Sequence, residues 1–186
     1  MSSSAKKPTH QHAIIHLLRS TSFLLVIAGL VACRPREWKQ YSHPEDGVAF
    51  SLPSEPVMTE KSFEAKAGHG NTRSYRTDSA GFGAPLYEVS VTTYPNDLDV
   101  KVSLENFKTK LSENGTKKIV NDHPIALQSY SGEEFDLETD KVHERLRYYV
   151  VKNRVVGVFV VMSAGEPFPV DMDRFFHSLQ LLDAAK

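Results

Sequence analysis

The sequence predicts a single α+β domain, built from short strands and two amphipathic helices and preceded by a secretory leader. Alternating polar and apolar residues, bounded by turn residues, predict strands along most of the chain. The period changes to that of a helix after Ser103 and again after Asp171. Without residues 1–32 the chain has 154 residues, which is enough for one domain with a core and too few for two ordinary domains.

Residues 1–32 have the layout of a secretory signal. They contain three basic residues and no acidic residue, and the run from Phe23 to Val31 is apolar except for Gly29. A membrane span would need about 20 continuous apolar residues. An uncleaved anchor is therefore a weaker alternative than a cleaved leader.

The leader ends in Leu30-Val31-Ala32-Cys33, which resembles the lipobox of bacterial lipoproteins. In that family the cysteine receives a diacylglycerol, the leader is cut before it, and the new amino group is acylated. The resemblance implies that residues 1–32 are removed and that Cys33 anchors the protein to a bacterial membrane, facing the periplasm or the cell exterior. A lipid on Cys33 would also explain the only cysteine of an exported chain. An ordinary signal peptide ending near Ala32 is the other alternative.

The rest of the chain divides simply. Residues 33–37 are the lipidated cysteine and a short tether, residues 38–182 form the domain, and residues 183–186 are a frayed tail. The four tether residues after Cys33 span at most about 14 Å. We therefore expect the domain to lie close to the lipid.

Hairpins and strands are predicted over the first half of the domain. Trp38–Tyr41 and Val48–Leu52 flank a turn at Pro44–Gly47, and the second of these strands is expected to be half-buried. His69, between two glycines, is expected at a loop tip. Further strands are expected at Val57–Ala65, Asn71–Thr77 and Leu86–Val91, with a loop at Ser79–Gly83.

A first helix is predicted to begin at a Ser103 cap and to end at Asn114-Gly115, because three apolar residues recur at helical spacing: Leu104, Phe107 and Leu111. Ile119, Ile125 and Leu127 then suggest extended chain that is interrupted at Pro124.

A second hairpin is predicted from Gly132–Glu138 and Val142–Val151. With a turn at Thr139-Asp140, the register would place Glu134 opposite Arg145, Asp136 opposite His143 and Glu138 opposite Lys141, all pairs of opposite sign.

Val155–Met162 is apolar without alternation, which predicts the central strand of the sheet. Asp171 is expected to cap a final helix whose apolar face carries Met172, Phe175, Phe176 and Leu179, before a short extended tail at Leu181-Leu182.

Turn and core residues at both ends of the domain resemble a bacterial branch of the PsbP-like superfamily: Trp38-Lys39-x-Tyr41, Pro44-x-Asp46-Gly47-Val48-x-Phe50-Ser51-x-Pro53-x-x-Pro56 and Asp173-Arg174-Phe175-Phe176-x-Ser178-Leu179. The resemblance covers Trp38 to Leu182. It implies a curved antiparallel sheet of about six strands with helices on both faces. Members include extrinsic subunits of photosystem II, which bind a larger complex and are not enzymes, and many lipoproteins of unknown role.

Composition narrows the function classes. Without residues 1–32 the net charge is −4, and no basic patch stands out, which argues against a nucleic-acid partner. No glycine-rich phosphate loop and no Cys-x-x-Cys motif is present, so no cofactor is predicted. Five acids between Glu133 and Asp140 could bind calcium, but alternation divides them between two faces, and nearby Lys141 and Arg145 would neutralise them.

Two functions follow as hypotheses. The first is a lipid-anchored, non-catalytic binding or assembly module at the cell envelope, with the membrane and a protein as its partners. The second is an envelope hydrolase whose active site forms only on folding, for which the candidate residues are His123, Ser129, Asp136 and His143. A small-ligand carrier, with a pocket between sheet and helix, is a third possibility.

Overall fold

The computed structural model describes residues 37–78, 83–97, 99, 100, 102, 106, 109 and 118–182. The chain divides into two compact units, Met1–Arg36 and Glu37–Lys186, and the description below concerns the second. The predicted leader, Cys33 and the frayed tail lie outside the described residues, as do Ser103 and the apolar positions predicted for the first helix. Among the described residues, no helix is both long enough and apolar enough to cross a bilayer.

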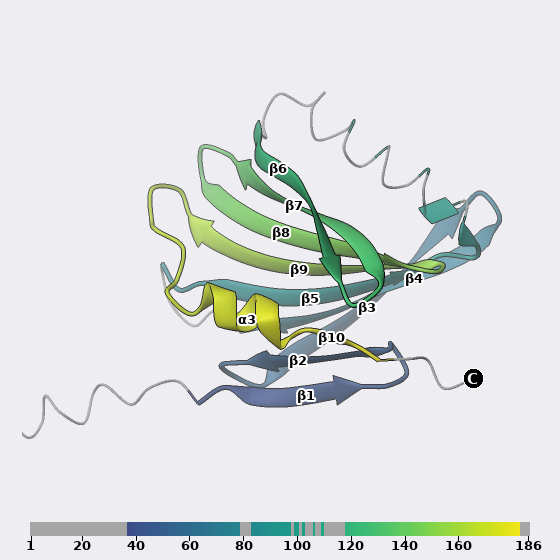
Figure 1. Ribbon diagram of the computed structural model, residues 1–186, viewed down its shortest axis with the longest axis horizontal. Coiled ribbons are helices and arrows are strands. Elements are labelled where there is room, and N and C mark those ends of the chain that lie inside the picture. Colours follow the sequence, from purple (N-terminus) through teal and green to yellow (C-terminus); the bar gives the residue numbers. More distant parts are fainter. Residues whose placement is uncertain are drawn as a thin grey trace, which may run out of the picture. The chain divides into compact units, whose positions relative to one another are not determined.

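Two antiparallel sheets form the domain (Figure 1). The larger sheet has seven strands in the order β3-β4-β5-β9-β8-β7-β6, and the smaller has the order β1-β2-β10. The strands are β1 (Lys39–His43), β2 (Val48–Leu52), β3 (Pro56–Ala65), β4 (Gly68–Thr77), β5 (Leu86–Thr93), β6 (Lys118–Leu127), β7 (Tyr130–Glu138), β8 (Val142–Val151), β9 (Arg154–Ser163) and β10 (Gln180–Leu181).

The helix α3 (Met172–Ser178) lies on the concave side of the larger sheet, beside β2 (Figure 1). The prediction of one sheet of about six strands was therefore wrong, since the strands of the domain divide between two sheets. A second helical stretch covering the convex face stays a prediction, because α3 is the one helix whose full bounds are described.

The main core fills the space between the concave face of the larger sheet and the layer formed by β2, α3 and β10. Phe50, Tyr87 and Phe175 are fully buried there, with ring centroids of Tyr87 and Phe175 5.1 Å apart in an edge-to-face arrangement. β9 lies at the middle of the larger sheet, which confirms the prediction made from its unbroken apolar run. A second apolar cluster lies on the convex face, around Phe135 and Leu146.

The final helix is confirmed, with Met172, Phe175 and Phe176 buried against the core. Its predicted cap is only partly correct. Asp171 is the N-cap residue by position, but its carboxylate makes no capping hydrogen bond and accepts one from the Tyr87 hydroxyl instead. The short extended tail is confirmed as β10, which pairs with β2.

The register predicted for the second hairpin was wrong by two residues. Asp136 lies opposite Arg145, and Glu134 lies opposite Arg147. The cause is the turn, in which the Thr139 hydroxyl accepts hydrogen bonds from the backbone N–H groups of Lys141 (3.1 Å) and Val142 (2.9 Å). A shift of two residues keeps every side chain on its face, so acidic residues still lie opposite basic ones, although each acid has a different partner from the one predicted.

Three smaller expectations were also wrong. β2 is buried on both faces and not on one, because it is the middle strand of the small sheet and contacts α3. His69 lies within β4, although it is exposed as expected. The β6–β7 ladder continues through Pro124, because β6 is an edge strand, where the missing N–H costs no ladder hydrogen bond, and the irregularity in its register lies between Val120 and His123 instead.

The helical stretch after β5 begins earlier than the predicted Ser103 cap. Asp97, Asp99, Val100 and Val102 are already helical. The Asn96 carboxamide oxygen accepts a hydrogen bond of 3.0 Å from the Asp99 N–H, which is the contact expected of an N-cap residue.

Candidate functional site

Asp136, the acid of the predicted hydrolase site, and the neighbouring Glu134 are held in ion pairs on the concave face. Arg145 donates two hydrogen bonds to Asp136, of 2.6 and 2.8 Å, and Asn121 donates a third of 2.8 Å. Two residues along each strand, Arg147 forms an ion pair with Glu134 through its Nε atom. These acids are therefore neutralised within the fold.

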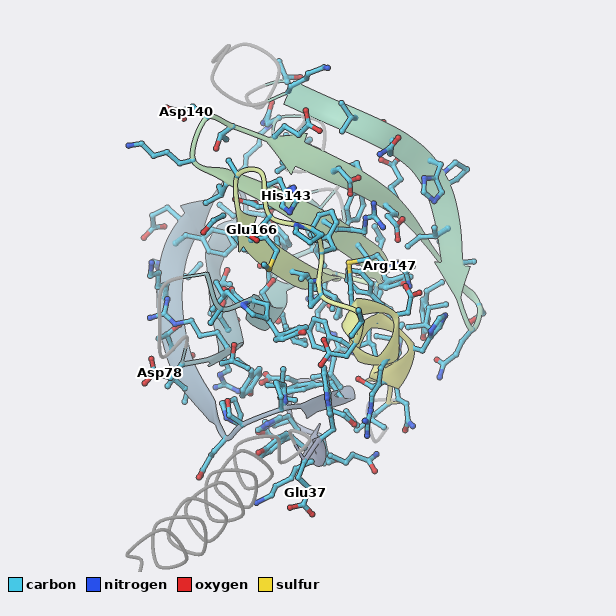
Figure 2. The ribbon with its side chains drawn as sticks, turned by 90° about the vertical axis from the view of Figure 1, so that its left-hand side faces the viewer. Glu37, Asp78, Asp140, His143, Arg147 and Glu166 are labelled. Atoms are coloured by element: carbon cyan, nitrogen blue, oxygen red, sulfur yellow. The ribbon has the colours of Figure 1, made fainter. Side chains whose placement is uncertain are left out.

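The arginines of these pairs also lie against aromatic rings near α3. The Arg145 guanidinium lies 4.8 Å from the centre of the Phe168 ring, and that of Arg147 lies 4.3 Å from Phe176. Figure 2 shows Arg147 and His143 on the concave side, beside the segment that leads into α3. Burial raises the pKa of Asp136, but the hydrogen bonds from Arg145 and Asn121 outweigh it, and the net shift of that pKa is downward.

The structure does not bring the four hydrolase candidates together. Ser129 is exposed in the turn between β6 and β7, whereas Asp136 lies six residues beyond the start of β7, about 20 Å away at the rise of a strand. His143 pairs with Glu138 and is farther still. His123 lies near Glu134, with 3.7 Å between Nε2 and Oε1. A serine, a histidine and an acid therefore do not meet at this face.

Two histidines stack on aromatic rings, one buried and one half-buried, instead of facing a site. His43 lies 4.0 Å from the ring centre of Tyr75, and His143 lies 4.2 Å from that of Phe168. In both, the Nε2 atom is buried and has no hydrogen-bond partner among the described residues. No group of three or more metal-ligating side chains occurs in that part of the chain either. Two of the acids considered for calcium, Glu134 and Asp136, form ion pairs with Arg147 and Arg145.

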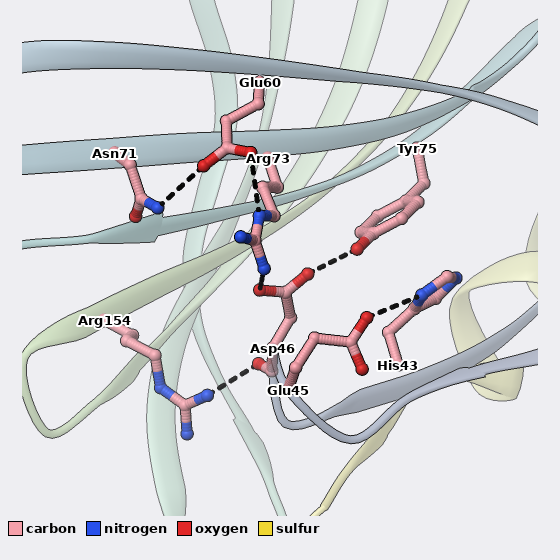
Figure 3. Close-up of polar contacts among 8 residues, drawn as sticks. All are labelled: His43, Glu45, Asp46, Glu60, Asn71, Arg73, Tyr75 and Arg154. Atoms are coloured by element: carbon pink, nitrogen blue, oxygen red, sulfur yellow. Dashed lines mark hydrogen bonds and ion pairs between the residues drawn. The ribbon is translucent and has the colours of Figure 1, made fainter.

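A second polar cluster holds the turn of the first hairpin against the larger sheet (Figure 3). The Asp46 carboxylate accepts hydrogen bonds from Arg73 Nη1, at 3.0 Å, and from the Tyr75 hydroxyl. Its backbone carbonyl accepts one of 2.6 Å from Arg154. Burial and the hydrogen bond to Asp46 raise the pKa of Tyr75. Because these contacts join the β1–β2 turn to β4 and β9, we assign the cluster a structural role.

Gly47 completes this turn, and only glycine fits there. Its φ is +67°, and a Cβ would lie 2.5 Å from the Arg154 guanidinium. The Asp46-Gly47 pair of the family-like motif thus helps to hold the turn against the larger sheet.

An open pocket of about 480 Å³ lies on the convex face of β3, β4 and β5. Phe63 and Tyr94 form its aromatic side, with ring centroids 5.3 Å apart in an edge-to-face arrangement. Thr72 and Thr92 form its floor, and their hydroxyls are hydrogen-bonded at 3.0 Å. We call it the Phe63 pocket; its other described lining residues include Glu64, Lys66, Asp99, Val102 and Asn106.

The aromatic side of the Phe63 pocket is held by the backbone. Gly70, opposite Phe63 in the ladder, has no side chain, and the Phe63 ring occupies the place where its Cβ would be. Tyr94 is fixed at both backbone groups, since its N–H donates to Asn153 O (2.8 Å) and its carbonyl accepts from Asn153 Nδ2 (2.7 Å). The rings are therefore positioned before any ligand binds.

Asp99 is the unusual member of the pocket. Only 6% of the residue is exposed, and its Oδ2 atom is buried with no hydrogen-bond partner among the described residues. A buried carboxylate oxygen without a donor is costly, and such atoms are rare in folded proteins.

Sequence reasoning missed this pocket. Phe63 is more than 30 residues from Tyr94 and Asp99 in sequence, and none of the three belongs to a motif. The one local signal was Gly68-His69-Gly70, whose second glycine makes room for the Phe63 ring.

A second hollow of about 460 Å³ continues the Phe63 pocket along the same face and shares Phe63 and Thr72 with it. It is lined by the hydroxyls of Thr59 and Ser74 and by charged side chains of both signs: Lys61, Arg76 and Glu88. The convex face of β3 to β5 thus carries a groove of two adjoining hollows, which is lined by both polar and apolar surface.

Comparison with known proteins identifies a structural neighbour only. No family model matches the sequence, and no curated protein matches it. Among solved structures, the chain is similar to the solution structure of cyanobacterial PsbP (CyanoP) from Synechocystis sp. PCC 6803. The identity is 10%, the TM-score is 0.45, and the match covers 80% of this chain and 96% of that one. That neighbour bears the name of the superfamily that the turn and helix residues resemble, and membership of the superfamily stays a prediction.

Proposed function

We propose that the chain is a lipid-anchored, non-catalytic binding module of the bacterial cell envelope, held to a membrane through Cys33. The proposal rests on one observation: the side chains that could act in catalysis are held in ion pairs or lie far apart. Glu134 and Asp136 form ion pairs with Arg147 and Arg145, and Ser129 lies in the turn at the far end of the same strand. The accessible feature is instead a groove suited to binding.

The position of the anchor supports the same function. β1 begins at Lys39, six residues after Cys33. Such a short connection keeps the domain within about 20 Å of the lipid surface. A module held there can reach membrane proteins and surface polymers without a long stalk. Two or more acyl chains would make that attachment stable, since one chain alone binds only marginally.

Anchoring is tested directly by labelling cells with palmitate. The wild-type protein should take up label and stay with membranes in high salt, leaving them only in detergent. The Cys33→Ala variant should take up none and retain its leader. A wild-type protein without label, or one that washes off in high salt, would refute the lipid anchor.

The binding role is tested by crosslinking in intact cells and recovery of the tagged full-length protein. Reproducible recovery of one envelope component, lost when the groove is blocked by Thr72→Arg, supports the proposal. Recovery of no component in repeated experiments contradicts it.

A small-ligand carrier is the second candidate, and the Phe63 pocket is what favours it. Addition of a soluble acceptor for the ligand separates the two functions. A carrier would release its ligand to a soluble acceptor, whereas a binding module would remain attached to a large envelope component.

A further inference from the structure

We infer that two copies of the chain associate by pairing their β3 strands antiparallel, edge to edge, about a two-fold axis at Met58. The inference goes beyond the proposed function and does not depend on the lipid anchor. It begins with the two outer strands of the larger sheet, which are β3 and β6 in the described part of the chain. An edge strand carries backbone groups that can pair with another strand, and most proteins protect such edges.

The two edges differ in their protection. β6 contains Pro124, and its ladder with β7 is irregular between Val120 and His123. Both features hinder the addition of a further strand. β3 has a proline only at its first residue, Pro56, and its ladder with β4 is regular through Ala65. β3 is therefore the edge that can accept another strand.

The acidic side chains of β3 are directed toward β4 and not across the free edge. Glu60 contacts Arg73 Nε at 3.3 Å and accepts a hydrogen bond of 3.2 Å from Asn71 (Figure 3). Glu64 lies 2.9 Å from His69 Nδ1, which also belongs to β4. Because these charges are engaged within the sheet, they leave the backbone of the outer edge accessible.

Two consecutive apolar residues are uncovered on this edge. Val57 is 44% exposed and Met58 is 54% exposed, and they are two of the four large apolar residues that are exposed in the described structure. Successive side chains of a strand point to opposite faces. Val57 lies opposite Arg76 on the convex face, and Met58 lies opposite Tyr75 on the concave face. A strand added at this edge would cover both of them.

The charges of the segment favour a second copy of the chain as the added strand. With the axis at Met58, this residue faces Met58 of the second copy, and Val57 faces Thr59 of that copy. Glu55, which directly precedes β3, then faces Lys61 of the second copy. Both of these charged residues are exposed. The two-fold axis repeats every such pair, so the ion pair forms at both ends of the paired segment.

Neighbouring registers lack this complementarity. An axis at Glu60 or at Lys61 would place two like charges directly opposite each other. An axis at Thr59 would place the apolar Val57 and Met58 opposite charged side chains. The axis at Met58 pairs two methionines at the centre and opposite charges at both ends. The segment is therefore complementary to itself in one register, as a two-fold interface requires.

The register is tested by disulfide formation in full-length protein that carries Cys33→Ala, which removes the only natural cysteine. Facing residues of an antiparallel pair have Cα atoms about 4.5–5.5 Å apart, within reach of a disulfide. Met58→Cys should therefore give a disulfide-linked dimer under mild oxidation. Glu60→Cys is the matched control, because its counterpart in the second copy is displaced by about 13 Å along the strand, and it should give none.

Association itself is measured by sedimentation of the full-length protein in a density-matched detergent, and we expect a dimer. Met58→Lys should weaken it about tenfold or more, because two like charges would meet at the axis. Lys61→Glu should also weaken it, and addition of Glu55→Lys to that variant should restore it, because opposite charges face each other again. Val170→Lys, at a fully exposed apolar residue outside β3, is the control and should change nothing.

Each outcome decides the inference. A monomeric wild type would overturn it, as would crosslinking of Glu60→Cys without crosslinking of Met58→Cys. A dimer that is insensitive to both Met58→Lys and Lys61→Glu would show two chains sharing a micelle and overturn it as well. The altered side chains are exposed, so every variant should keep the melting temperature of the wild type. Because Cys33→Ala leaves the β3 edge intact, failure of anchoring and failure of dimerisation are separate results.

Discussion

The ion pair between Asp136 and Arg145 gives the sharpest prediction on stability. The perturbation is a double-mutant cycle of Asp136→Asn and Arg145→Met, in which methionine keeps the apolar contact with Phe168. The side chain of Asp136 is 8% exposed and that of Arg145 is 26% exposed. Breaking a fully buried pair costs about 3–5 kcal/mol. Since a quarter of the arginine is in water, we expect each single variant to lose about 2–3 kcal/mol.

The assay is urea and thermal unfolding of the full-length protein, followed by circular dichroism. A loss of 2–3 kcal/mol corresponds to a fall in melting temperature of about 4–12 °C for a domain of this size. The double variant should lose less than the sum of the two single variants, with a coupling energy above about 1 kcal/mol. Glu60→Gln is the control, because Glu60 contacts Arg73 at 3.3 Å with 43% of its side chain exposed, and it should cost less than about 1 kcal/mol.

The same pair predicts a pH dependence. The pKa of Asp136 is lower in the folded protein than the value of about 3.9 of an unfolded chain. A carboxyl of this kind stabilises the fold fully above the unfolded pKa, and its contribution is lost as the pH falls through the folded pKa. The difference in unfolding free energy between wild type and Asp136→Asn should thus shrink below about pH 4. Single variants that each cost under 1 kcal/mol, or a difference that grows in acid, would refute the reasoning.

Three further predictions concern packing and turns, and all are checked by urea unfolding. Gly132→Ala should cost about 3 kcal/mol, because its Cβ would collide with the carbonyl oxygen of Tyr148 and lie 2.8 Å from the Tyr149 ring. Gly165→Ala is the control: it has open space around it and should cost only the strain of its φ of +85°, about 1–2 kcal/mol. Equal costs for the two variants would contradict the collision. Phe175→Ala should cost about 3–5 kcal/mol, since the ring is fully buried in the main core, and a smaller loss than for Phe63→Ala would contradict that assignment. Thr139→Val should cost about 1–2 kcal/mol through loss of the turn hydroxyl, and Thr139→Ser should restore most of it; a neutral Thr139→Val would show that the hydroxyl does not set the register.

Local patterns were enough to locate most strands. Alternation and turn residues placed the hairpin of β1 and β2, the long strands β3, β4, β7 and β8, and the central strand β9 close to their observed bounds. The final helix was found for the same reason, since its apolar spacing is local and strong. What failed depended on contacts outside each segment.

The register of β7 and β8 shows the limit clearly. Both registers pair acidic with basic residues, so charge could not decide between them; the hydrogen bonds of the Thr139 side chain in the turn did. The effect of Pro124 was predicted wrongly, because β6 can contain a proline only as an edge strand, and its place at the edge is a property of the whole sheet. The Phe63 pocket could not be predicted, since it joins side chains from β3, the end of β5 and the helical residues that follow.

The small sheet has a consequence for the order in which the protein forms. β2 is flanked by β1, its neighbour in sequence, and by β10, which is separated from it by more than a hundred residues. The second contact has a long loop to close and cannot form until the end of the chain is available. A chain shortened before Gln180 would leave one edge of β2 unpaired, because Val48 and Ala49 would lose their partners in β10. The small sheet can therefore be completed only after Gln180 and Leu181 have been synthesised, long after β1 and β2.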